Sequence, residues 1–132
     1  MTDKAITGQS QRQLRVGEQL RHILVETLQK GHFHDEVLLR DSSLITVTEV
    51  QVTPDLKNAT AFIVRLGGGN MKPLLSALND NSAAFQREFA HQLRIRNTPR
   101  LRFVADTSFE KAARIEMILS NLPKTGEGRA ED

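Results

Sequence analysis

The 132-residue chain contains no cysteine, tryptophan or tyrosine, and six phenylalanines are its only large aromatic residues. Without cysteine, disulfide bonds and thiolate metal sites are excluded. With so few rings, a platform that stacks successive unpaired bases is not expected. A contact with nucleic acid would have to rely on phosphate, shape and backbone groups.

Long hydrophobic runs are also missing. No apolar stretch approaches the ~18 residues that a transmembrane helix requires. The first eight residues are largely polar and contain no signal-peptide apolar region. We therefore expect a cytoplasmic protein that does not associate with membranes. Its length and its 39% hydrophobic content fit a single globular domain.

Patterns that would indicate catalysis or a metal are weak. The acidic residues are scattered, and no serine stands in a nucleophile-elbow pattern. His32, His34 and Asp35 form an incomplete metal fragment, and neither His22 nor His91 is placed to complete it. Histidines near the negative end of a preceding helix explain this cluster without a metal. We expect no enzyme, no metal and no cofactor, with a small hydrolase of unrecognised site as a remote alternative.

Positive charge is concentrated in one stretch of the chain. The formal net charge is only +2, but residues 87–102 contain five arginines against one glutamate, a net charge of +4. Apolar residues keep a core-facing rhythm through this stretch, so we predict a folded element with a cationic outer surface. Such self-repulsion usually has an anionic partner that offsets it. The five arginines are Arg87, Arg94, Arg96, Arg100 and Arg102.

Arginine suits a phosphate partner, because its forked donors can bind two phosphate oxygens at once. The competing interpretation is a solvated surface that is partly paired with carboxylates elsewhere. A second basic stripe follows the first predicted helix and consists of Arg12, Arg15 and Arg21. That stripe is equally compatible with RNA contact and with a solvated face balanced by Glu18 and Glu26.

The first half of the chain predicts a helix and a β-hairpin. Ser10 and Gln13 form a capping box for a helix over 11–30, and Gly31 suits its C-cap. A β-branched strand at 44–52 changes its alternation phase, which predicts a bulge near Thr48 and Glu49. A second strand over 59–66, with one apolar face, should pair with it antiparallel. The side chains of that face are Phe62, Val64 and Leu66.

The second half predicts two helices, a strand and a last helix. Asn70 can cap a helix that breaks at a kink near 79–83, beyond which a second helix resumes. A third strand follows Pro99, and Thr107 with Glu110 forms a capping box for a helix ended by Pro123. Its inward side chains should be Ala112, Ile115, Ile118, Leu119 and Leu122. The order predicts an α+β domain with a helix-covered three-stranded sheet.

These elements divide the chain into three parts. We expect a flexible N-terminal arm at 1–9, one domain at 10–123 and a disordered tail at 124–132. The order α-β-β-α-kink-α-β-α is that of a type II K-homology (KH) domain with one helix added at the end.

Four segments make the resemblance more specific. They are QRQLRVGEQLR at 11–21, ITVTEVQVTPDLK at 45–57, LRIRNTPRLRF at 93–103 and DTSFEKAARI at 106–115. In this order and spacing, they resemble the bacterial ribosome-binding factor A family over roughly residues 10–122. The resemblance implies a KH-like RNA-binding domain, and a monomer when it is off the ribosome.

The resemblance also implies the partners. The family binds the immature small (30S) ribosomal subunit and 16S rRNA near the decoding region, assists late processing of the 16S 5′ end, and supports growth in the cold. An assembly GTPase would drive its release. The alternative function is a protein-interaction adaptor, whose basic face would bind an acidic protein partner.

The interhelical kink departs from the family pattern. KH domains usually have a Gly-x-x-Gly loop there, which lets the nucleic-acid backbone approach closely. The family replaces that loop with Ala-x-Gly, and the matching residues here are Asn81, Ser82 and Ala83, without the glycine. Alanine is tolerable if the kink needs no positive φ; otherwise Asn81 should absorb the strain. We therefore expect arginine side chains, more than close backbone approach, to supply RNA affinity.

Overall fold

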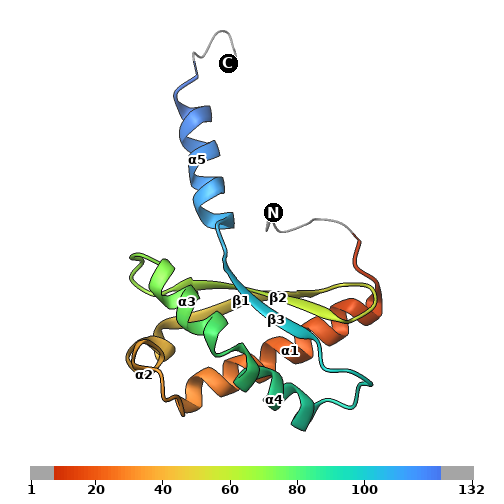
Figure 1. Ribbon diagram of the computed structural model, residues 1–132. Helices are drawn as coiled ribbons and strands as arrows, with labels where there is room; N and C mark the ends of the chain where they lie inside the picture. The colour runs from red at the N-terminus through yellow and green to blue at the C-terminus, as the bar shows by residue number, and fades with distance from the viewer. Residues whose placement is uncertain (1–7, 123–132) are drawn as a thin grey trace.

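The computed structural model describes residues 8–122, which form a three-stranded sheet with helices packed on one face (Figure 1). The predicted arm at 1–9 and tail at 124–132 fall mostly or wholly outside the described residues, as does Pro123. The elements are α1 (Gln11–Lys30), α2 (Glu36–Asp41), a 3₁₀ turn (Ser42–Leu44), β1 (Ile45–Val52), β2 (Asn58–Arg65), α3 (Lys72–Asp80), α4 (Ser82–Gln92), β3 (Arg100–Ala105) and α5 (Ser108–Ser120).

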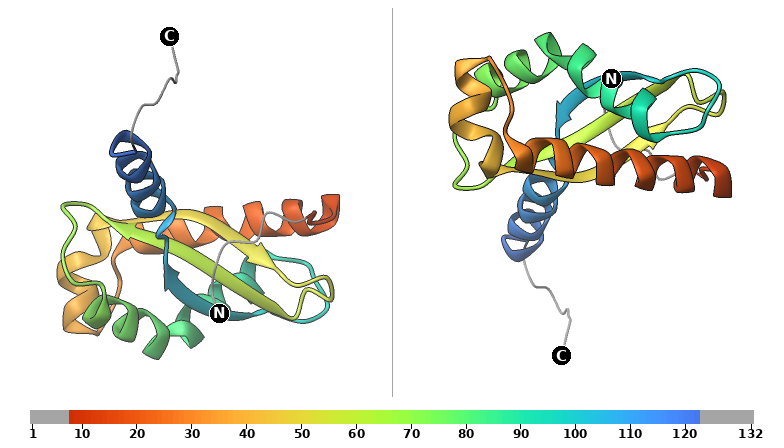
Figure 2. Two further views of the ribbon diagram at one scale, coloured as in Figure 1. Left: turned by 90° about the horizontal axis from the view of Figure 1, so that it is seen from above. Right: turned by 90° about the horizontal axis from the view of Figure 1, so that it is seen from below.

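The sheet has the order β1-β2-β3 and is mixed. β1 and β2 pair antiparallel as predicted, and β3 lies parallel to β2 at one edge of the sheet. Helices α1, α3 and α4 cover the same face of the sheet, which Figure 2 shows from above and from below. The predicted α+β class is therefore confirmed, as is the order of the predicted elements, to which the structure adds α2 and the 3₁₀ turn.

Helix α1 begins and ends where its sequence signals indicate. The Ser10–Gln13 capping box is present, and Gly31 adopts a left-handed conformation at φ 66°. Gln13 also donates from its side-chain amide to the carbonyl of Val52 at 2.8 Å, which ties the helix start to the end of β1. Gly17 faces β1 so closely that a Cβ atom would collide with the backbone oxygen of Val50.

The hairpin has the predicted bulge, because its register shifts between Val47 and Glu49. The apolar face predicted for β2 is not the one that faces the helices. The core instead receives the alternate side chains of that strand, namely Ala59, Ala61 and Ile63. Leu66 lies beyond the end of β2 and is exposed. Alternation identifies the two faces of a strand, but both faces of this one carry apolar residues.

Helix α2 was missed by the sequence interpretation, which treated this region as a polar connection. With six residues it is too short to show a helical period. Its N-cap is Asp35, whose Oδ1 accepts hydrogen bonds from the backbone of Val37 at 2.8 Å and of Leu38 at 3.2 Å. Leu38 is fully buried, so this short helix closes one end of the core.

Helix α5 differs most from its prediction. It projects from the sheet on the side opposite α1 (Figure 1), and none of its residues is buried. The expected Thr107–Glu110 capping box is absent; the Asp106 carboxylate instead accepts a hydrogen bond from the backbone of Ser108 at 2.9 Å. The apolar side chains expected to point inward are exposed: Ala112, Ile115, Ile118, Leu119 and Leu122. Their spacing correctly predicts a helix, but it carries no information on what the helix packs against.

Candidate nucleic-acid interface

Five exposed arginines lie along one continuous piece of backbone, which we call the arginine surface. Helix α4 ends at Gln92, and Leu93 turns the chain into an extended conformation. The connection 93–99 then leads to buried Pro99 and on to β3. The members are Arg87 on α4, Arg94 and Arg96 in the connection, and Arg100 and Arg102 on β3. The sequence therefore located all five correctly on an outer surface.

Pairing distinguishes these arginines from Arg21, Arg40 and Arg65. Arg21 pairs with Glu18 at 2.6 Å, and Arg40 and Arg65 both approach the carboxylate of Asp41. Within residues 8–122, by contrast, no carboxylate forms an ion pair with any member of the arginine surface. The described part of the chain therefore shows none of the carboxylate pairing that the competing interpretation includes, while a solvated surface is still compatible with it. Five exposed cations along one stretch of backbone, with no ion pair to the described carboxylates, favour a polyanionic partner.

The stripe on α1 divides into two kinds of arginine. The guanidinium of Arg21 donates two hydrogen bonds to Glu18, which lower the pKa of that carboxyl and raise the pKa of Arg21. This arginine is therefore already compensated, as the balanced interpretation requires. Arg12 and Arg15 are exposed and form no ion pair with the other residues that the structure describes. The start of α1 lies at the same end of the molecule as the connection 93–99 (Figures 1 and 2).

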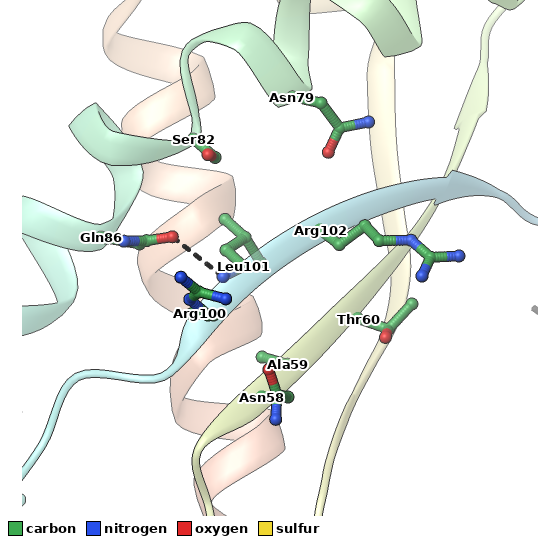
Figure 3. A pocket seen from close by; sticks show the side chains of 9 residues that line it. All are labelled: Asn58, Ala59, Thr60, Asn79, Ser82, Gln86, Arg100, Leu101 and Arg102. Carbon is green, nitrogen blue, oxygen red and sulfur yellow. Dashed lines mark hydrogen bonds between the residues drawn. The ribbon is translucent and has the colours of Figure 1, made fainter.

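A groove of about 750 Å³ lies where β3 meets the junction of α3 and α4. Arg100 and Arg102 line it from the strand, and Ser82 lines it from the junction (Figure 3). Other lining residues come from β2 and from the two helices: Asn58, Ala59, Thr60, Asn79 and Gln86. Two guanidinium groups thus share the groove with hydroxyl and amide groups, a combination suited to ribose and phosphate.

Two amide side chains that the sequence interpretation missed connect the helices to the edge of β3. Asn79 accepts from the backbone N–H of Phe103 at 2.8 Å and donates to its carbonyl at 3.1 Å. Gln86 accepts from the backbone N–H of Leu101 at 3.0 Å (Figure 3). The polar residues 79–82 gave only a turn signal, because a long-range partner of an amide has no local sequence pattern.

The interhelical kink is formed without strain. Asn81 joins α3 to α4 at φ −105°, and none of the kink residues Asn81, Ser82 and Ala83 has a positive φ. The condition under which the missing glycine would cost stability therefore does not arise. The amide of Asn81 donates to the carbonyl of Ala77 at 2.7 Å and reaches the carboxylate of Asp35 at 3.4 Å, which connects the kink to α2.

No metal-binding cluster of three or more His, Cys, Asp or Glu side chains occurs among residues 8–122. Asp35, the carboxylate of the suspected fragment, serves as the N-cap of α2. In the same part of the chain, no helix has the length and apolar character needed to cross a membrane.

A model of the ribosome-binding factor A family matches residues 12–119. The chain belongs to this family. Among its relatives, ribosome-binding factor A of Paramagnetospirillum magneticum is 47% identical over 112 residues, which cover 85% of this chain and 78% of that protein. The resemblance indicated by the four sequence segments is thereby confirmed. Members of the ribosome-binding factor A family are binding factors and not enzymes.

Solved structures have the same fold. The solution structure of a putative ribosome-binding factor A from Thermotoga maritima has a TM-score of 0.61 at 23% identity, over 77% of this chain and 93% of that one. A homology model of Thermus thermophilus ribosome-binding factor A, fitted into a cryo-electron microscopy map of a 30S complex, has a TM-score of 0.57 at 23% identity, over 72% of this chain and 96% of that one.

Proposed function

We propose that this chain binds the immature small (30S) ribosomal subunit and 16S rRNA, and that it assists late maturation of the subunit in the cytoplasm. Membership of the ribosome-binding factor A family supports the proposal, as does the 30S complex of the Thermus thermophilus relative. The observation that carries it is the arginine surface, whose five exposed cations have no ion pair within residues 8–122.

The resemblance supplies the finer part of the proposal. The protein would bind 16S rRNA near the decoding region, assist processing of its 5′ end and support growth in the cold. An assembly GTPase would drive its release, and the free protein would be a monomer. No chemical step is needed for such a role. A factor that binds one local rRNA arrangement more tightly than another shifts the population toward it.

The first test is salt-dependent binding of the full chain to purified immature 30S subunits. Each arginine–phosphate contact releases counterions, so log affinity should fall with log salt by about 0.7 to 0.9 per contact. Four or five contacts therefore predict a slope of roughly −3 to −4.5. No binding at low salt would sink the proposal. Tight binding to an acidic protein, with none to subunits or RNA, would select the adaptor function instead.

A paired charge reversal assigns the binding to a surface. Arg94→Glu with Arg96→Glu should weaken subunit binding at least about tenfold, because attraction to phosphate becomes repulsion. The thermal unfolding temperature should barely change, since both side chains are exposed. The matched control is Lys111→Glu with Arg114→Glu, which makes the same charge change on α5. Equal losses in both variants would show that net charge, and not the arginine surface, determines binding.

A further inference from the structure

Part of the free edge of β3 is occupied by side chains of the protein itself. In the parallel pairing with β2, the backbone N–H groups of Arg100 and Asp106 donate inward to Lys57 and Ile63. The backbone groups of Leu101, Phe103 and Ala105 consequently face the open edge. Asn79 and Gln86 bind three of these outward groups: both groups of Phe103, and the N–H of Leu101.

Beside the groove, two amides therefore take the place that a neighbouring strand would have at Leu101 and Phe103. An unpaired strand edge offers alternating donors and acceptors, which can pair with another chain. The same donor and acceptor pattern can pair with the edge of an unstacked nucleic-acid base. At Phe103, Asn79 supplies both an acceptor and a donor, so neither the N–H nor the carbonyl of this residue is open to a base.

The remaining lining of the groove favours the nucleic-acid backbone over the bases. No aromatic side chain is among the nine residues that line it, so stacking on a ring is not available there. The charged groups are the guanidiniums of Arg100 and Arg102, and neither forms an ion pair within residues 8–122. Guanidinium and hydroxyl groups bind phosphate and ribose, which are the same at every nucleotide.

We propose that the groove at β3 binds the ribose–phosphate backbone of a single RNA strand without reading its bases, and that Asn79 and Gln86 enforce this by occupying the outward backbone groups beside the groove, namely the N–H of Leu101 and both groups of Phe103. The two amides are specificity-determining residues that act through β3. This inference rests on the proposed function and adds the class of contact made at one site. Selectivity for the subunit would then come from the shape of the folded rRNA.

The test measures binding of the full chain to single-stranded RNAs of about 12 nucleotides at low salt, using oligo(A), oligo(C), oligo(U) and mixed sequences. The wild-type affinities should agree within about threefold, because phosphate contacts are sequence-independent. A spread of about tenfold or more would overturn the inference, since that is the size of a base-reading contact. Arg100→Gln with Arg102→Gln should weaken every RNA by the same factor; a loss confined to one sequence would also overturn it.

The second part of the experiment removes the two amides from the edge of β3 and repeats the same binding measurements. With Asn79→Ala and Gln86→Ala together, the affinities for the different RNA sequences should differ by about fivefold or more, because backbone donors and acceptors of β3 become available to bases. An unchanged spread would contradict the role of the amides. Gln92→Ala is the matched control, as this amide on α4 bonds to Glu88 at 3.4 Å and not to the strand.

A substitute variant covers the case of misfolding, and a comparison with subunit binding separates failure of this inference from failure of the proposed function. If the double variant does not fold, Asn79→Asp keeps an acceptor for the Phe103 N–H and loses the donor to its carbonyl. Its spread should widen in the same way, and an unchanged spread counts against the inference. Subunit binding by a wild type that binds none of the RNAs overturns this inference alone. Absence of binding to both subunits and RNA at low salt overturns the proposed function as well.

Discussion

Gly17 determines how closely α1 approaches β1. Its buried position faces the backbone oxygen of Val50, at the bulged part of the strand, where a methyl group would collide. Because a backbone oxygen cannot rotate away as a side chain can, the helix or the strand has to move. The close approach also allows the Gln13 amide to reach the carbonyl of Val52.

We predict that Gly17→Ala destabilises the protein by about 1–2 kcal/mol. Alanine gains up to about 1 kcal/mol in a helix interior, but overpacking against backbone costs typically 1–3 kcal/mol. Urea unfolding measures the difference. Gln19→Ala, on the exposed face of the same helix, should stay within about 0.5 kcal/mol of wild type. A more stable Gly17→Ala protein would show that α1 and β1 separate at little cost.

The sequence predicts single residues well where the signal is local. Ser10, Gln13 and Gly31 lie where helix caps belong, and the structure confirms them. Asn79 and Gln86 could not be assigned, because their partners lie 24 and 15 residues away. Their amides bond to backbone, which leaves no complementary residue type in the sequence. These hydrogen bonds could not be predicted because their partners are far apart in the sequence, and not because the bonds are weak.

At the scale of elements, α5 separates helix formation from packing. Its periodicity is helical, yet Ile115 and Leu119 are exposed by more than half, at 56% and 59%. The periodicity of α1 looks similar, but Leu20 and Leu24 are fully buried. What differs is the end of β3, which directs α5 away from the sheet face that the other helices cover (Figure 1). The direction in which a helix leaves a strand depends on the tertiary structure, and the periodicity of the helix does not encode it.

A matched pair of truncations tests this difference. Leu119→Ala should cost less than about 0.5 kcal/mol, because the side chain is already in water. Leu20→Ala should cost about 2–5 kcal/mol, since it leaves a cavity in the core. Chemical denaturation of both variants measures the two values. A cost above about 2 kcal/mol for Leu119→Ala would mean that α5 packs on the domain in solution.

The kink between α3 and α4 gives a second prediction at this scale. Ala83→Gly restores the glycine of the family pattern, but no residue of this kink has a positive φ that glycine would relieve. The variant should therefore lose about 0.5–1 kcal/mol, the usual cost of glycine in a helix. Affinity for subunits should stay within about twofold, as Ala83 does not line the groove. A clear gain in affinity would show that RNA backbone needs the space at residue 83.

At the scale of the whole molecule, the fold was predictable and the site only in part. Periodicity and turn chemistry gave the α+β order, and the four family-like segments gave the family. The five arginines were found because charge density is visible in the sequence. The groove could not be predicted, because it is formed by two segments that are separate in the sequence, the edge of β3 and the α3–α4 junction. Packing between the rings of Phe85 and Phe103, whose centroids are 5.2 Å apart, brings α4 and β3 together.

The same scale explains how the parts cooperate. Helix α4, the connection 93–99 and β3 follow one another in the chain, so one continuous stretch of backbone carries all five arginines. Phe85 and Phe89 are fully buried beneath that path and hold α4 in place. Arg87, Arg100 and Arg102 are thereby presented from regular elements, which lowers the backbone entropy lost when they bind.

The most direct test of the central claim is a density map of this protein bound to immature 30S subunits. We predict that the arginine surface, Arg87, Arg94, Arg96, Arg100 and Arg102, faces the phosphates of 16S rRNA, with the α3–α4 junction beside the same strand. A map in which this surface faces solvent, or an acidic ribosomal protein, would contradict the account.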